Sequence, residues 1–305
     1  HAYFAEESYG LAAASLPNFD AVGRLDVDLP FDPAGRDFED LSVDGNRAYL
    51  AAWGFGVFVV DLTDPSAPVE LGRFQFPFAS TIEAHGDRVY VASTTNGGIF
   101  KVLDVSDPAH PAELGSIDTS QTYALTVRGD YAFLADGADF GDGGLRVVDV
   151  SNPASPGVVG QETGCPYADG LDVSADSNTV YLACASDENF SNALRIIDTT
   201  DKSNPQLIGT VALPGSVQLP DYNVAHAVLV VGTTAYVANE YGVDEVDLTD
   251  PANPVATVRH DTGYPVRSLA RAPDGRILAF AGEAGVFVFA PQNTEGTIFA
   301  DGFDG

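Results

Sequence analysis

The feature that most constrains this chain is a phrase that recurs along it: an apolar strand, an Asp, a Pro-rich turn and a Gly position. Five copies read GVFVVDLTDPSAPVELG at 56–72, IFKVLDVSDPAHPAELG at 99–115, GLRVVDVSNPASPGVVG at 144–160, ALRIIDTTDKSNPQLIG at 193–209 and GVDEVDLTDPANPVATV at 242–258. The spacing from Asp to the Gly position is constant. The copies recur about every 42–50 residues, which is the length of one four-stranded propeller blade. The repeat therefore predicts a β-propeller.

Each repeat divides into four short runs of β-branched and aromatic residues bounded by Gly, Asn, Asp and Pro. The sequence predicts a single all-β domain over 1–305, a seven-bladed β-propeller with four-stranded antiparallel blades, with six or eight blades as alternatives. Complete blades are expected to start near residues 38, 80, 122, 168, 225 and 266. Residues 1–30 look like a partial first blade without its first strand, and 291–305 look like a closing strand and tail.

The recurring Asp stands where the third strand of each repeat ends. An Asp in this place can accept backbone N–H bonds from the turn that follows, and the prolines stiffen that turn. We therefore expect a structural role for this set, which comprises Asp61, Asp104, Asp149, Asp198 and Asp247.

The composition restricts the partners. The formal net charge is −30 and only two lysines occur, so the surface repels phosphate backbones and anionic lipids, and nucleic acid is a poor partner. No apolar run approaches the length of about 18 residues that a membrane span needs, so direct membrane insertion is not expected. The charge suits a protein that is soluble outside the cell.

Two further observations favour export. The chain starts at His1 and contains no Met, which is expected if a leader is cleaved before His1, and a secreted or cell-surface location follows. Cys165 and Cys184 are the only cysteines. One precedes the first strand of its repeat and the other follows the second strand, so both lie at the same end of one blade. A disulfide between them is predicted.

The repeated phrases resemble the LVIVD repeat, a β-propeller repeat of exported and surface proteins of bacteria and archaea. The resemblance implies export and a propeller, and it carries no established reaction. The ending GTIFADGFDG at 296–305 also resembles an IFADGFE-like C-terminal tail that is common on exported proteins.

Positions that differ between otherwise regular repeats are the candidate site. They precede the first strand or follow the second strand of each blade, and in a propeller both places face the mouth of the central channel. The predicted ligand-binding residues are Glu39, Asp40, Trp53, Tyr123, Asp169, His226, Glu240 and Arg267. The alternative is that these residues only line a solvent-filled channel and bind no ligand.

Two enzymatic uses of these residues are open. Arg267 could hold a carboxylate while His226 or Tyr123 moves a proton, as a polysaccharide lyase requires. Glu39 and Asp169 could instead form the acid/base pair of a glycoside hydrolase. Neither arrangement has a sequence signature.

A Gly-rich loop, DGADFGDGG at 136–144, carries a weak calcium signal. Asp136, Asp139 and Asp142 offer oxygen ligands, but the spacing is not that of an EF-hand. Ca²⁺ is therefore the one cofactor that the sequence suggests, and an acidic hairpin loop is the alternative.

The function that the sequence favours is a binding or assembly module for a protein or glycan partner at the cell surface or outside the cell. The partial first blade offers an unpaired strand that a second copy could complete by β-augmentation. A secreted carbohydrate-active enzyme with its site at the channel mouth is the alternative.

Overall fold

The computed structural model describes residues 1–6, 10–15, 21–26, 38–95, 97–137, 143–185, 192–213 and 225–289. These residues form seven antiparallel sheets. The only helical turn among them is the 3₁₀ segment η1 (Gly282–Ala284). In each sheet the strands follow one another in chain order, so every sheet is an up-and-down meander. The fold is that of a seven-bladed β-propeller, as predicted.

The chain divides into two compact units. Unit 1 contains His1–Ala132 and Val148–Val158, and unit 2 contains Phe133–Val147 and Val159–Gly305. One sheet has residues in both ranges and is formed by β12 (Gln121–Arg128), β13 (Tyr131–Gly137), β14 (Gly144–Asp149) and β15 (Gly157–Thr163).

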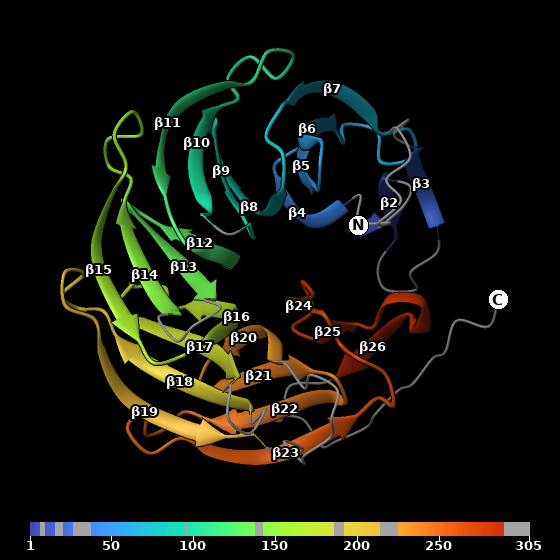
Figure 1. Ribbon diagram of the computed structural model, residues 1–305. Coiled ribbons are helices and arrows are strands. Elements are labelled where there is room, and N and C mark those ends of the chain that lie inside the picture. Colours follow the sequence, from blue (N-terminus) through green and yellow to red (C-terminus); the bar gives the residue numbers. More distant parts are fainter. Residues whose placement is uncertain are drawn as a thin grey trace. The chain divides into compact units, whose positions relative to one another are not determined.

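Unit 1 holds three further sheets. The first comprises β1 (Ala2–Glu6), β2 (Gly10–Ala14) and β3 (Ala21–Asp26). The second comprises β4 (Phe38–Asp44), β5 (Arg47–Ala52), β6 (Gly56–Asp61) and β7 (Val69–Phe74), and Figure 1 shows these four strands in order. The third comprises β8 (Ala79–His85), β9 (Arg88–Ser93), β10 (Ile99–Asp104) and β11 (Ala112–Asp118).

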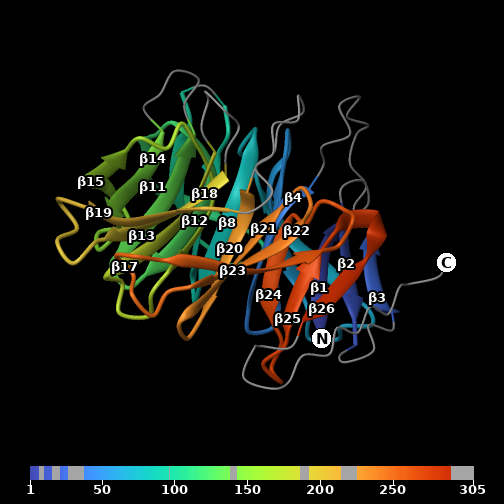
Figure 2. The same cartoon turned by 90° about the horizontal axis from the view of Figure 1, so that it is seen from below.

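Unit 2 also holds three further sheets. One comprises β16 (Tyr167–Val173), β17 (Thr179–Ala185), β18 (Asn192–Asp198) and β19 (Gln206–Ala212), labelled in order in Figure 1. The next comprises β20 (Ala225–Val231), β21 (Thr234–Asn239), β22 (Gly242–Asp247) and β23 (Val255–Asp261), which are labelled in Figure 2. The last comprises β24 (Ser268–Arg271), β25 (Ile277–Phe280) and β26 (Val286–Phe289).

The second and third strands of the repeats are buried on both faces, because each sheet packs its apolar side chains against a neighbouring sheet. In unit 1, Tyr49 and Val59 pack with Ile82 and Leu103 of the next sheet. In unit 2, Leu194 and Ile196 pack with Val237 and Val246 in the same way. The core therefore lies between blades, as the repeat requires.

The Gly of the repeated phrase permits a close approach between sheets. A Cβ built on Gly72 would lie 2.4 Å from the carbonyl oxygen of Pro108, and one built on Gly160 would lie 2.0 Å from that of Lys202. The other glycines of this set meet the turn of the next repeat in the same way: Gly23, Gly115 and Gly209. The fifth copy has Val258 at this position, and the repeat that follows it has lost the Asp and Pro turn.

The recurring Asp caps the turn, as predicted. Asp61 accepts a hydrogen bond from the backbone N–H of Thr63 at 2.8 Å, and Asp149 accepts one from Ser151 at 2.8 Å. The same bond, two residues ahead, is made by Asp104, Asp198 and Asp247. The hydroxyl of that same residue, and then its N–H, hold the pKa of each carboxyl below its usual range.

The terminal sheets have three described strands each. Gly23 in β3 occupies the position of the fourth-strand glycine, so β1, β2 and β3 correspond to the second, third and fourth strands of a blade. The partial first blade expected at 1–30 stays a prediction. The expected closing strand and tail at 291–305 lie outside the described residues, and completion of the first blade by another chain stays a prediction.

Candidate functional site

A β-bulge marks the start of the first strand in four sheets. The register with the second strand shifts between Phe38 and Asp40, and a shift of the same kind occurs in β8, β16 and β20. The residues that the shift passes over are Glu39, Ser80, Asp169 and His226. A bulge bends the strand locally and re-aims its side chain. The four positions, where the residue differs from repeat to repeat, therefore share the same local backbone geometry.

In unit 2 the structure brings together four of the predicted residues, Asp169, His226, Glu240 and Arg267, which we call the charged cluster. Asp169 and His226 stand at the bulges of β16 and β20, Glu240 follows β21, and Arg267 precedes β24. The Nδ1 atom of His226 lies 2.7 Å from Oδ2 of Asp169, and Nε2 lies 2.8 Å from Oε1 of Glu240. Nη1 of Arg267 lies 3.0 Å from the same Glu240 oxygen.

Electrostatics favour a charged imidazole in this cluster. Burial disfavours the imidazolium, but hydrogen bonds to Asp169 and Glu240 outweigh it and raise the pKa of His226 above its usual value. The hydrogen bond from His226 lowers the pKa of Glu240 in turn. Nη1 of Arg267 also lies 2.5 Å from Nε2 of His226, and the charge of this guanidinium opposes the rise in the pKa of His226.

The four members differ in access to solvent. The His226 side chain is only 11% exposed, whereas that of Arg267 is 57% exposed. Among the described residues, no hydrogen bond engages Nη2 or Nε of Arg267. The cluster therefore offers guanidinium donors and the edges of two carboxylates above a fixed histidine.

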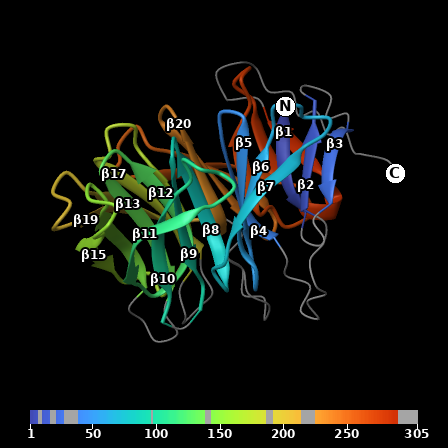
Figure 3. The ribbon, with the colours of Figure 1, turned by 90° about the horizontal axis from the view of Figure 1, so that it is seen from above.

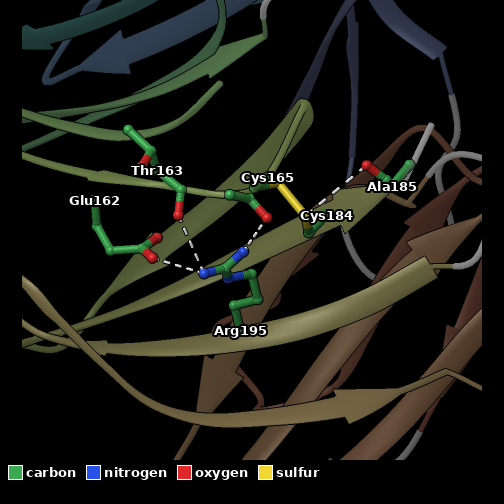
Figure 4. Close-up of a disulfide and its surroundings, with 7 residues drawn as sticks. Glu162, Thr163, Cys165, Cys184, Ala185 and Arg195 are labelled. Atoms are coloured by element: carbon green, nitrogen blue, oxygen red, sulfur yellow. Dashed lines mark hydrogen bonds and ion pairs between the residues drawn. A yellow bond between two sulfur atoms is a disulfide. The ribbon is translucent and has the colours of Figure 1, made fainter. Parts of the chain in front are cut away.

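The predicted disulfide is present and lies beside the cluster. Cys165 precedes β16, and Cys184 in β17 is paired in register with Ala168, the residue before Asp169. Figure 4 shows Arg195 next to this bridge. Arg195 donates hydrogen bonds to Glu162 at 2.6 Å, to the Thr163 carbonyl at 3.4 Å and to the Gly164 carbonyl. The disulfide and the Arg195 hydrogen bonds therefore both hold the segment 162–165, which precedes the bulge at Asp169.

Among the other predicted ligand-binding residues, Asp40 uses its carboxylate for hydrogen bonds within its own sheet and to the next sheet. Its Oδ2 accepts hydrogen bonds from the N–H of Ile82 at 2.9 Å and the hydroxyl of Thr81 at 3.1 Å, and its Oδ1 accepts one from the N–H of Leu41. Burial nevertheless raises the pKa of Asp40 to about 6, and nearby Glu83 adds to the rise. Asp40 thus ties β4 to the first strand of the next sheet.

The remaining predicted residues lie in unit 1. Glu39 is exposed at the bulge of β4. Trp53 lies in the turn after β5 and packs edge-to-face against Phe78, with the ring centroids 5.0 Å apart. The exposed Tyr123 in β12 donates its hydroxyl to Gln121 at 2.9 Å.

The sequence analysis did not predict a series of side chains in the first strand of one sheet that accept hydrogen bonds from backbone N–H groups at the first strand of the next sheet. Ser42 and Asp44 accept the N–H groups of Ala84 and Gly86, next to the bond from Ile82 to Asp40. The bonds from Val127 to Glu83 and from Val230 to Asp172 repeat the pattern in other sheets. The signal that could have revealed it is a polar residue at every second position of 40–44.

Of the three predicted calcium ligands, only Asp136 lies among the described residues. Asp136 is buried and its Oδ2 lies 2.6 Å from Nε of Arg146, while Asp139 and Asp142 lie outside the described residues. Within the described part of the chain, no group of three or more His, Cys, Asp or Glu side chains is arranged to hold a metal ion. No helix in that part is long and apolar enough to span a membrane.

A buried polar pair in β22 was also not foreseen. Asp244 accepts a hydrogen bond from Asn239 at 2.8 Å, and Glu245 lies 2.7 Å from Nε2 of His260. Burial raises the pKa of Asp244 to about 6, although Arg259 opposes the rise. The phrase GVDEVD differs from the other four copies exactly here, which is the signal in the sequence.

The sheets and their repeated turns define a β-propeller, and comparison with known families names its class. LVIVD repeats match residues 35–75, 78–119, 121–163, 172–212 and 224–262, which is more than half of the chain. The chain belongs to the LVIVD repeat family. No curated protein matches it.

Solved structures share the fold at low identity. A protein from Lactobacillus plantarum is 14% identical with a TM-score of 0.76, covering 97% of this chain and 92% of its own. A protein of unknown function from Desulfotomaculum acetoxidans is 12% identical with a TM-score of 0.72, covering 95% and 90%. A candidate 6-phosphogluconolactonase from Bacteroides fragilis is 12% identical with a TM-score of 0.72, covering 97% and 91%. At such identities the likeness concerns the fold alone.

Proposed function

We propose that this protein is an exported binding module that recognises a glycan partner through the charged cluster. The observation that carries the proposal is the clamped His226, held between Asp169 and Glu240 at 2.7 and 2.8 Å with Arg267 above it. Two strands of different sheets, the turn after β21 and the segment before β24 supply these side chains, so the cluster is not a by-product of one strand.

The charge balance favours a neutral, hydroxyl-rich ligand. Two carboxylates face one imidazolium and one guanidinium, so the cluster has no net charge although the whole chain carries −30. Sugar hydroxyls both donate and accept, and they can pair with carboxylate oxygens and guanidinium N–H groups at the same time. A strongly anionic ligand would instead meet the field of the whole protein.

Rigidity supports a binding role as well. The bulges, the disulfide and the Arg195 hydrogen bonds fix Asp169 before any ligand arrives. A preorganised site loses little conformational entropy on binding. The disulfide and the family resemblance support export, and glycans are abundant outside the cell.

A uronate lyase is the second candidate, because His226 and Arg267 are in contact as that chemistry requires. The arrangement favours binding over proton abstraction. Both ring nitrogens of His226 face carboxylates, and the pKa of His226 is raised, so the ring is held in its acid form rather than as a base.

The test is a glycan array with the full-length chain, followed by calorimetry on each hit. Arg267→Ala and His226→Gln should each weaken binding at least about tenfold, since each removes charge-assisted hydrogen bonds. Arg271→Ala is the matched control, because Arg271 is an exposed arginine four residues further along the chain. Equal binding by all variants would place recognition elsewhere. Cleavage of a hit with release of an unsaturated product would favour the lyase.

A further inference from the structure

The most unusual aromatic side chain of the described residues is Phe78. Its backbone has φ of 70°, and among non-glycine residues in the described ranges only Ser177 shares a positive φ. A left-handed backbone costs roughly 1–2 kcal/mol for a residue with a Cβ, and glycine avoids this cost. Phe78 is also 41% exposed, so burial of the ring does not explain its presence. Phe78 therefore has an unfavourable backbone conformation in which part of its apolar ring is exposed to water.

The Phe78 ring is not isolated. Trp53 lies 5.0 Å away, centroid to centroid, with an angle of 70° between the ring planes. Trp53 follows β5 and Phe78 precedes β8, and these two strands lie side by side (Figure 3). The rings therefore form two steep walls at one place on unit 1, which we call the aromatic corner.

Carboxylates stand at the same end of these sheets. Phe38 is paired in register with Ala52, the residue before Trp53, so Glu39 and Asp40 begin their strand beside the aromatic corner. Asp40 accepts hydrogen bonds from Thr81 and Ile82, three and four residues after Phe78. Among the described residues, two acidic side chains thus stand at the start of the strand beside the aromatic corner.

We propose that the aromatic corner binds a cationic side chain, Lys or Arg, of a basic partner protein. The faces of aromatic rings attract a cation that lies within about 6 Å of the centroid, and two rings at a steep angle can contact it together. The net charge of −30 attracts a basic protein surface over long range and raises its association rate. Phe78 holds its strained backbone because the ring is required on that wall.

This site is separate from the charged cluster and does not depend on the proposed glycan binding. All of its residues belong to unit 1, whereas the charged cluster lies in unit 2. A neutral sugar can also stack on an aromatic face, but it gains nothing from the surrounding acidic charge. The charge thus selects a cation.

The experiment uses a reporter that the chain already contains. Trp53 is the only tryptophan, so its fluorescence reports on the corner alone. The full-length protein is titrated with an Arg/Gly-alternating decapeptide, with a Gln/Gly decapeptide as the neutral match, at about 0.15 M salt, where the Debye length is about 8 Å. Tetramethylammonium is tested against 3,3-dimethyl-1-butanol, its neutral analogue of similar shape, and cello- and xylo-oligosaccharides form the third arm.

The expected result is a saturable change with the Arg peptide and none with the Gln peptide. Phe78→Leu should weaken Arg-peptide binding by about 3- to 10-fold, which is the range of one cation–π contact. Phe78→Gly should weaken it similarly and still fold, because glycine accepts the left-handed backbone without strain. Tyr264→Leu is the control, since Tyr264 is an aromatic residue of unit 2 that is 55% exposed.

Three outcomes would overturn the proposal. Equal responses to the charged and neutral peptides would make the corner an apolar patch. A response to oligosaccharides without one to the Arg peptide would assign it to sugars. A response to tetramethylammonium alone would assign it to a small quaternary ammonium ion rather than to a protein side chain.

Discussion

The two ends of each blade differ in what they repeat. Where the third strand ends, five copies carry the same Asp, which makes the same hydrogen bond two residues ahead. Where the first strand begins, four sheets share the same bulge but present four different residues: Glu39, Ser80, Asp169 and His226. We call these the turn end and the bulge end.

The difference shows which side chains the backbone requires. At the turn end the same backbone geometry always occurs with an Asp, so the Asp side chain is needed to form the turn. At the bulge end a fixed geometry tolerates an acid, a hydroxyl or an imidazole, so the backbone does not choose the side chain. The side chains that vary at the bulge end are therefore available to recognise a ligand, and four experiments test this difference between the two ends.

The largest effect is expected from the disulfide at the bulge end. The double variant Cys165→Ser with Cys184→Ser should lose about 3 kcal/mol of unfolding free energy, because the bridge closes a loop with a sequence separation of 19. Urea unfolding measures this loss, and reduced wild-type protein is the control that should match. The pKa of His226, followed by NMR, should fall as Asp169 loses its fixed position. An unchanged pKa would separate the bridge from the cluster.

The next effect concerns the glycine of the turn end. Gly160→Ala should cost about 1–3 kcal/mol, since the added Cβ would meet the Lys202 carbonyl at 2.0 Å and the sheets must shift. Gly157→Ala in the same strand is the control, because a Cβ there meets nothing within 4 Å. Thermal unfolding of both variants gives the comparison. Similar melting temperatures would mean that the close approach does not limit the packing of these sheets.

A smaller loss is expected when one capping Asp is removed. Asp149→Ala should lower the unfolding free energy by about 0.5–1 kcal/mol, because the N–H of Ser151 loses its acceptor but gains water at an exposed turn. Asp118→Ala, at an exposed position of β11, is the control and should change little. If both variants behave alike in urea, the repeated Asp is not a stabilising cap.

The smallest effect is a difference in pH dependence. The raised pKa of His226 means that its contribution is complete below a pH of about 6.5 and is lost as pH rises through the folded-state pKa. The lowered pKa of Asp149 means that its contribution is complete above a pH of about 4 and is lost in acid. Unfolding curves from pH 3 to 9 should flatten on the alkaline side in His226→Gln and on the acid side in Asp149→Ala.

Much of the architecture was readable in the sequence. Runs of β-branched and aromatic residues and a constant Asp-to-Gly spacing predicted the strands, the blade count and the capped turns, since these depend on local pattern and chain length. The Cys165–Cys184 bridge was also predictable, because an up-and-down sheet brings those two points to one end.

The site was less predictable because it depends on distances across sheets. The sequence singled out Asp169, His226, Glu240 and Arg267, but nothing in their spacing showed that one imidazole would face two carboxylates. Asp40 was grouped with them, although its carboxylate holds the N–H of Ile82. The left-handed backbone of Phe78 had no signal at all, since local propensity argues against it.

The alternating acceptors of β4 have a consequence for aggregation. Asp40 and Ser42 accept hydrogen bonds from the N–H groups of Ile82 and Ala84 in β8, and Asp44 accepts one from Gly86 in the turn that follows β8. A foreign strand needs those donors in order to grow a cross-β fibril from β8. Resistance to fibril formation is therefore encoded in the neighbouring blade, and an apolar substitution in β4 could create an amyloid template in β8 without altering the sequence of β8.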